Sequence, residues 1–157
     1  MSEDDAPTRI VADADVLAAD VLVGGVAREV LDHIRGHSWL TLVASDHLLD
    51  DAESVIAHLG DETLAADWRT LIERERVSVT HPPEDHPALA SAYRGDAAHL
   101  LSFDETLTSA TVNFSIQPHA SLSIRPPDAF ARLFDPKRLY ESLHDDEYPG
   151  PDGEGEI

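Results

Sequence analysis

The stretch Arg9-Ile-Val-Ala-Asp-Ala-Asp15 decides the fold, because it joins a short apolar run directly to two acidic residues. A short apolar run that ends at polar residues is typical of a buried strand of a parallel sheet. Further runs of this kind occur at residues 39–43, 77–79, 99–102 and 120–124. We therefore expect five strands, the first over residues 9–12, followed by a polar loop that starts at Asp13.

Segments with helical spacing separate these runs. They are residues 26–34, 46–59, 61–74, 87–93 and 129–134, and residues 137–143 offer a further helical stretch. Strands that alternate with helices predict an α/β fold, a three-layer sandwich around a central, mostly parallel sheet of about five strands. We expect this domain to span residues 9–144, between a flexible N-terminus (1–8) and a disordered acidic tail (145–157).

The charge of the chain is strongly negative. Its 157 residues include 31 acidic and 11 basic side chains, for a net charge of −20; aspartate (19) outnumbers glutamate (12), and Lys137 is the single lysine. This composition is typical of halophilic archaeal proteins, since at ~1 M salt the Debye length falls to ~3 Å and self-repulsion is screened. The surface charge therefore reflects adaptation to a solvent of high salt, and it neither supports nor excludes a nucleic-acid partner.

Several classes of protein are excluded by the composition. The chain has no cysteine, so disulfides and thiolate metal sites are absent. No apolar run reaches the ~18–20 residues that a membrane span needs, and the acidic start at Met1 is unlike a secretory signal. Glycine-rich phosphate-binding loops are also missing. We expect a cytoplasmic protein without a membrane partner.

Acidic residues follow the predicted strands. Asp13 and Asp15 follow the first, Asp104 follows the fourth, Asp85 precedes a helix, and Asp51 lies in the first turns of the helix after the second strand. The carboxyl ends of parallel strands meet at one edge of a sheet, where ligands bind. Clustered carboxylates repel one another unless a cation neutralises them, and oxygen ligands suit Mg²⁺ or Mn²⁺. Such a site can activate water for phosphodiester hydrolysis.

The order and spacing of these acids resemble a PIN domain, the fold of many metal-dependent ribonucleases. The similar segments are Ile10-Val-Ala-Asp-Ala-Asp-Val-Leu17, Ser45-Asp-His-Leu-Leu-Asp-Asp-Ala52, Asp85-His-Pro-Ala-Leu-Ala-Ser-Ala92, the segment from Gly95 to Leu107, and Ser123-Ile-Arg-Pro-Pro-Asp-Ala-Phe130. The resemblance covers residues 9–134. Two positions depart from the family pattern, with Asp51 where glutamate is usual and Asp15 where asparagine is usual.

The resemblance implies a metal-dependent endoribonuclease that acts on single-stranded RNA. By that resemblance, Asp13, Asp51, Asp85 and Asp104 are the catalytic residues and hold Mg²⁺ or Mn²⁺. Asp15 and Ser102 then lie in a second layer around the metal. The resemblance also implies a homodimer and an antitoxin-like protein partner. Asp50 remains an alternative to Asp51, although the apolar pattern directs Asp50 further toward solvent.

Two other interpretations are compatible with parts of the pattern. The first is a catalytically inactive PIN-like module that binds RNA or a protein partner. The second follows from Asp13 and Asp15, which also resemble the first motif of haloacid-dehalogenase-type phosphatases. That family needs a lysine between its later motifs, whereas Lys137 comes after every predicted strand. The inactive module is therefore the alternative that we keep.

Overall fold

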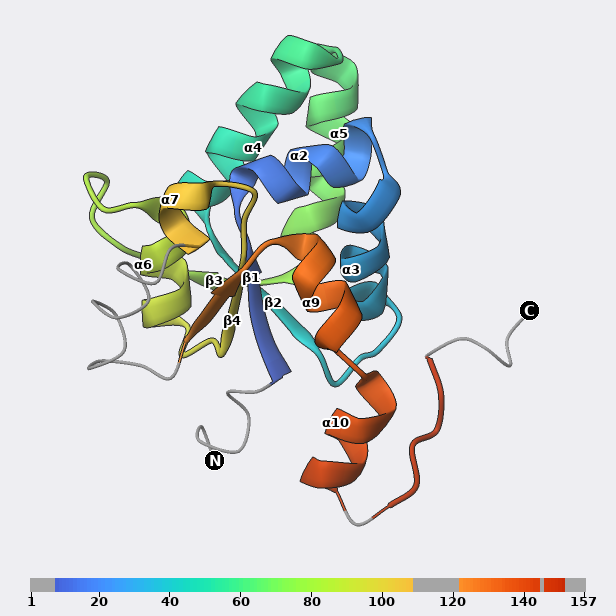
Figure 1. Cartoon of the computed structure of the whole chain (residues 1–157). Helices are drawn as coiled ribbons and strands as arrows, with labels where there is room; N and C mark the ends of the chain where they lie inside the picture. Colours follow the sequence, from blue (N-terminus) through green and yellow to red (C-terminus); the bar gives the residue numbers. More distant parts are fainter. Residues whose placement is uncertain (1–7, 109–121, 145, 152–157) are drawn as a thin grey trace.

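The computed structural model describes residues 8–108, 122–144 and 146–151. Its centre is a five-stranded sheet with the strand order β3-β2-β1-β4-β5 (Figure 1). The strands are β1 (Arg9–Ala12), β2 (Thr41–Ser45), β3 (Arg76–Val79), β4 (His99–Leu101) and β5 (Ser123–Arg125). Every pair of neighbouring strands runs parallel. The predicted α/β class is confirmed, and the sheet is parallel throughout.

The strand order reverses between β1 and β4. From β1 the chain moves outward through β2 to β3, and it then returns to the other side of β1 to form β4 and β5. Val11 of β1 is in register with Leu100 of β4 across this reversal. In sheets of this type, the crevice beyond the carboxyl ends of the two strands at the reversal is where ligands bind.

The helices form two outer layers. Their bounds are α2 (Ala14–Leu22), α3 (Gly25–Arg35), α4 (Asp46–Leu59), α5 (Glu62–Glu75), α6 (Pro87–Arg94), α7 (Glu105–Thr108), α9 (Pro127–Leu133) and α10 (Pro136–Leu143). Helix α6 packs on one face of the sheet, against β1, β2 and β4. Helices α3 and α9 pack together on the other face, and α2 packs on α4 above the carboxyl ends of the strands (Figure 1). This arrangement is a three-layer sandwich.

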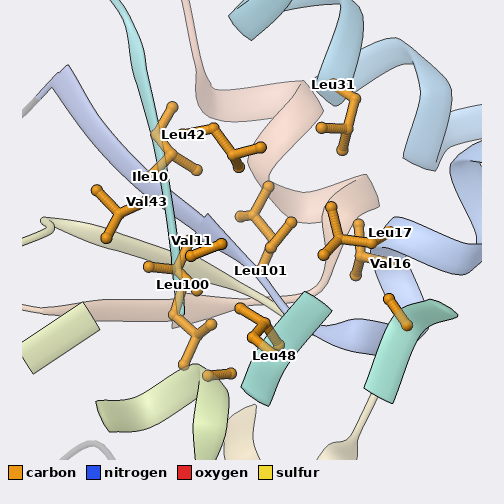
Figure 2. Close-up of a cluster of buried hydrophobic side chains, with 14 of the residues drawn as sticks. Ile10, Val11, Val16, Leu17, Leu31, Leu42, Val43, Leu48, Leu100 and Leu101 are labelled. Atoms are coloured by element: carbon orange, nitrogen blue, oxygen red, sulfur yellow. The ribbon is translucent and has the colours of Figure 1, made fainter. Parts of the chain in front are cut away.

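The core joins both faces of the sheet to the helices. Figure 2 shows side chains of β1, β2 and β4 meeting Leu17 of α2 and Leu31 of α3, and all of them are buried. Gly95, which ends α6, lies so close to the sheet that a Cβ there would collide with the side chain of Val43. Only a glycine lets the end of α6 approach β2 so closely, and this contact keeps α6 packed against that face of the sheet.

Three local predictions were wrong by a few residues. Asp13 is the N-cap of α2 rather than the start of a loop, because its side chain accepts a hydrogen bond from the amide of Ala14. The second strand begins at Thr41, two residues late, since a turn from His37 to Leu40 precedes it. The fifth strand begins at Ser123; residues 120 and 121 of the predicted strand lie outside the described residues.

The chain beyond α10 returns to the body of the protein. The hydroxyl of Tyr148 lies 2.5 Å from Nε2 of His37, and the two rings stack. The Tyr148 amide donates to the carboxylate of Glu141. Tyr148 belongs to the segment that the sequence predicts to be disordered. Within the described ranges, no helix has both the length and the apolar content that a bilayer span requires.

Candidate functional site

The site begins where β1 and β4 end side by side. The amide of Asp13 donates to the carbonyl of Leu101 over 2.8 Å, so the last hydrogen bond of the β1–β4 ladder places Asp13 beside the end of β4. One oxygen of the Asp13 side chain accepts from the amide of Ala14, and this bond starts α2. The other oxygen, Oδ2, is directed toward β4. The same carboxylate therefore caps a helix and faces the neighbouring strand.

Ser102 connects Asp13 to Asp104. Its fully buried hydroxyl donates to Asp13 Oδ2 over 2.8 Å and accepts from the amide of Asp104 over 3.0 Å. The Ser102 amide donates to the carbonyl of Arg125, which ties the same residue to β5. The carboxylate of Asp104 accepts from the amide of Thr106, at the start of α7. Ser102 thus holds the two acidic residues in place through a single buried hydroxyl.

Asp15 completes a group of three carboxylates. Its Oδ2 accepts from the amide of Phe103 over 3.2 Å, whereas its Oδ1 is buried without a hydrogen-bond partner among the described residues. Burial, and next the negative charge of Asp13, raise the pKa of Asp15 to about 6, with a smaller contribution from Asp104. The three carboxylates therefore repel one another, which a bound cation would relieve.

A groove of about 480 Å³ leads away from these acids. Asp13, Asp15 and Asp104 lie in its wall together with apolar residues of α2 and α4. Two of the apolar residues are strongly exposed, Val23 (79%) and Leu59 (69%). Phe103, beside the acids, is 44% exposed. The groove therefore offers a negatively charged region next to an open apolar surface.

The structure does not bring the other two predicted ligands into this group. Asp51 is exposed on α4, one turn before Val55, which lines the groove, so both residues lie on the same side of the helix. Asp85 is exposed in the loop before α6, where its amide donates to the carbonyl of Pro82. Among the described residues, no three acidic or histidine side chains are already gathered around one point at metal-binding distance.

The sequence did not predict the apolar side of the groove, and it placed Asp15 in a second layer around the metal rather than among the ligands. Both exposed apolar residues had a visible signal, because Val23 directly precedes Gly24 and Leu59 directly precedes Gly60. A glycine commonly ends a helix, which places both residues at helix ends. The burial of Asp15 had no such signal, since it depends on β4 lying beside β1.

The model of one protein family matches almost the whole chain. The chain belongs to this family, which is described as a family of unknown function (DUF7384), and the match covers residues 4–156. Neither the curated proteins nor the solved structures contain a match to the chain. The predicted membership of the PIN family is therefore wrong, because the chain matches a different family over nearly its full length.

This correction removes the support for everything that rested on the resemblance alone. The homodimer and the antitoxin-like partner had no other basis. Asp51 and Asp85 were also expected near the metal because they follow predicted strands, and the structure shows both of them exposed and outside the lining of the groove. The short motifs that suggested the resemblance are features that many parallel α/β proteins share, namely apolar strands that end in acids and helices that start at Ser or Pro. What remains is the geometry of Asp13, Asp15, Ser102 and Asp104 at the reversal of the strand order.

Proposed function

We propose that this member of the DUF7384 family is an endoribonuclease that binds Mg²⁺ or Mn²⁺ through Asp13, Asp15 and Asp104. The observation that carries the proposal is the arrangement at the ends of β1 and β4, where Ser102 holds two of the three carboxylates. The buried and unpartnered Oδ1 of Asp15 fits a cation, because an ionised oxygen without a partner is costly to bury. Carboxylate oxygens are the ligands that these cations prefer.

A divalent ion at this site would supply an activated water and stabilise the charge that develops on a phosphodiester during hydrolysis. The three carboxylates would bind the ion, and Ser102 would orient Asp13 through its hydroxyl. Residues that orient a metal ligand through a hydrogen bond, as Ser102 would, are commonly needed for metal affinity.

The apolar side of the groove supports a substrate that carries bases next to its phosphates. The exposed Val23 and Leu59 provide an apolar surface, and the ring of Phe103 could stack with a base. A single strand is favoured over a duplex because its bases are accessible. The negative charge of the protein opposes RNA binding at low salt, and a cytoplasm of high salt would screen this repulsion.

The decisive experiment measures cleavage of labelled single-stranded RNA with Mn²⁺ in ~2 M KCl, with a DNA strand of the same sequence in parallel. We expect metal-dependent cleavage of the RNA that both Asp13→Asn and Asp104→Asn abolish. Asp67→Asn is the matched control, since Asp67 is exposed on α5 and the variant removes the same charge elsewhere. Asp51→Asn and Asp85→Asn would retain activity if the three-carboxylate site is sufficient.

One observation favours a second candidate, a non-catalytic module that binds RNA or a protein partner. Among the described residues, the acidic side chains do not already form a metal-binding group. For this candidate, a folded wild-type protein would cleave no RNA with either metal but would still shift labelled RNA in a mobility assay or bind a protein partner. Cleavage that survives Asp13→Asn would instead place any nuclease activity elsewhere.

A further inference from the structure

A second cavity lies on the face of the sheet that α9 covers. Its volume is about 340 Å³, and residues of β4, β5, α9 and α10 line it. None of its lining residues belongs to the acidic groove. The lining includes His99, Arg125, Phe130, Phe134 and Arg138.

Among the described residues, two arginines at this cavity have no anionic partner within ion-pair distance. Asp135 also lines the cavity, and its carboxylate accepts hydrogen bonds from the amides of Lys137 and Arg138 at the start of α10. The side chains of Arg125 and Arg138 make no ion pair or hydrogen bond with the described residues, although the chain has 31 acidic side chains. Arg125 is moreover half-buried in the edge strand β5. By contrast, Arg132, an exposed arginine of α9, pairs with Asp128 of the same helix at 3.6 Å. The described part of the chain thus leaves a half-buried guanidinium available to an anionic ligand.

His99 adds an unpartnered polar atom to the same cavity. Its Nδ1 is buried and has no hydrogen-bond partner among the described residues. Its ring contacts that of Phe130 edge to face, with the centroids 5.2 Å apart. Burial, and next the charge of Arg125, lower the pKa of His99 to about 4, so the ring is neutral at pH 7. A neutral imidazole has no charge that would repel an ionic ligand, and its free nitrogen can form one hydrogen bond with the ligand.

Much of the remaining lining of the cavity is apolar. Phe130 and Phe134 stack with their ring centroids 4.7 Å apart, and Leu133 at the rim is 65% exposed. Ligand cavities typically combine such walls with a few polar groups that orient the ligand. The volume also lies in the range of about 300–1,000 Å³ that is usual for small molecules.

We propose that this cavity binds a small amphipathic carboxylate, such as an aromatic or branched-chain organic acid. The carboxylate lies between Arg125 and Arg138, and the apolar body packs on Phe130 and Phe134. Arginine binds carboxylates through paired hydrogen bonds, and both arginines line this largely apolar cavity. The site is independent of the proposed nuclease activity, because it shares no residue with the acidic groove.

Calorimetric titration tests the proposal on the full chain, in KCl at which circular dichroism shows a folded protein. The probes are 3-phenylpropionate, 4-methylpentanoate, the neutral 3-phenylpropanamide and inorganic phosphate. We expect saturable binding of at least one carboxylate at one site per chain, and weaker binding of the amide and of phosphate. Arg125→Gln and Arg138→Gln should each weaken carboxylate binding roughly tenfold, because each removes a charged hydrogen-bond donor.

Arg132→Gln is the matched control, and it should change the affinity less than about twofold because Arg132 does not line the cavity and already has a partner. Arg138 is exposed, so Arg138→Gln tests the site even if Arg125→Gln fails to fold. The proposal is overturned if neither carboxylate binds saturably, if the amide binds as tightly as 3-phenylpropionate, or if phosphate does. It is also overturned if both arginine variants bind like the wild type.

Discussion

Replacing the buried hydroxyl of Ser102 should affect both stability and metal binding. Ser102→Ala removes the donor to Asp13 Oδ2 and the acceptor for the Asp104 amide, two hydrogen bonds of 2.8 and 3.0 Å. Leaving one buried polar group without a partner costs about 1–3 kcal/mol, so we expect the free energy of unfolding to fall by about 2 kcal/mol. Loss of a group that orients a metal ligand typically weakens metal affinity roughly 10–100-fold.

Ser91→Ala provides a matched control for this prediction. Ser91 is also fully buried, and its hydroxyl accepts from the amide of Ser45 over 3.1 Å at the end of β2; neither residue lines the acidic groove. Urea denaturation should show a similar loss of stability in both variants. Titration of Mn²⁺ followed by electron paramagnetic resonance should show weaker binding only in Ser102→Ala. Equal Mn²⁺ affinity in the two folded variants would refute the role of Ser102 in orienting Asp13.

Two further predictions concern buried ionisable groups. Arg35→Met leaves the carboxylate of Asp20 (8% exposed) without its two bonds of 2.9 Å and with only Arg28 at 3.7 Å. Because Arg35 is about one-third exposed, we expect a loss of about 2 kcal/mol in urea denaturation, less than for a fully buried pair. The double variant with Asp20→Leu should recover most of it, and a double variant as unstable as Arg35→Met would contradict this account. The lowered pKa of His99, about 4 against 6.5 when unfolded, means that the unfolded chain binds a proton first as the pH falls. Stability should therefore decrease from pH 6.5 to pH 4, by at most about 3 kcal/mol, and His99→Leu should remove this part of the decrease. If the urea midpoint of the wild type and of His99→Leu depends on pH in the same way, His99 does not cause this decrease.

The fold was largely predictable because its elements are encoded locally. Helices α4 and α5 begin where the sequence placed them, since Ser45 and Asp61 accept hydrogen bonds from the amides of Leu48 and Leu64. The apolar runs predicted a mostly parallel sheet of about five strands, because strands buried on both faces read as short continuous apolar runs. The errors lie at the ends of elements. The second strand starts late, after the turn from His37 to Leu40, and Trp39 in that turn packs edge to face on Tyr140 of a distant segment.

The candidate site was predictable only in part. The rule that ligands bind beyond the carboxyl ends of parallel strands drew attention to Asp13 and Asp104, and the structure places them together through Ser102. The same rule could not decide about Asp85, which follows an edge strand and lies in an exposed loop. Nor could short motifs establish the family, since the spacing of a few acids is shared by unrelated parallel folds.

By itself, the sequence determined the class of the fold, the positions of most helices and the acidic character of the protein, because propensity, capping and charge act between near neighbours or over the whole chain. Only the tertiary structure decided the order of the strands, and the order decides which strand ends are adjacent. The pairing of β1 with β4 brings Asp13 and Asp15 to Ser102, which lies 87 residues beyond Asp15 in the chain. Residues of α9 and α10 likewise meet His99 of β4 and Arg125 of β5 at one cavity, which brings Arg125 and Arg138 to the same lining. Neither grouping follows from spacing along the chain, because each depends on burying apolar surface between elements that are far apart in sequence.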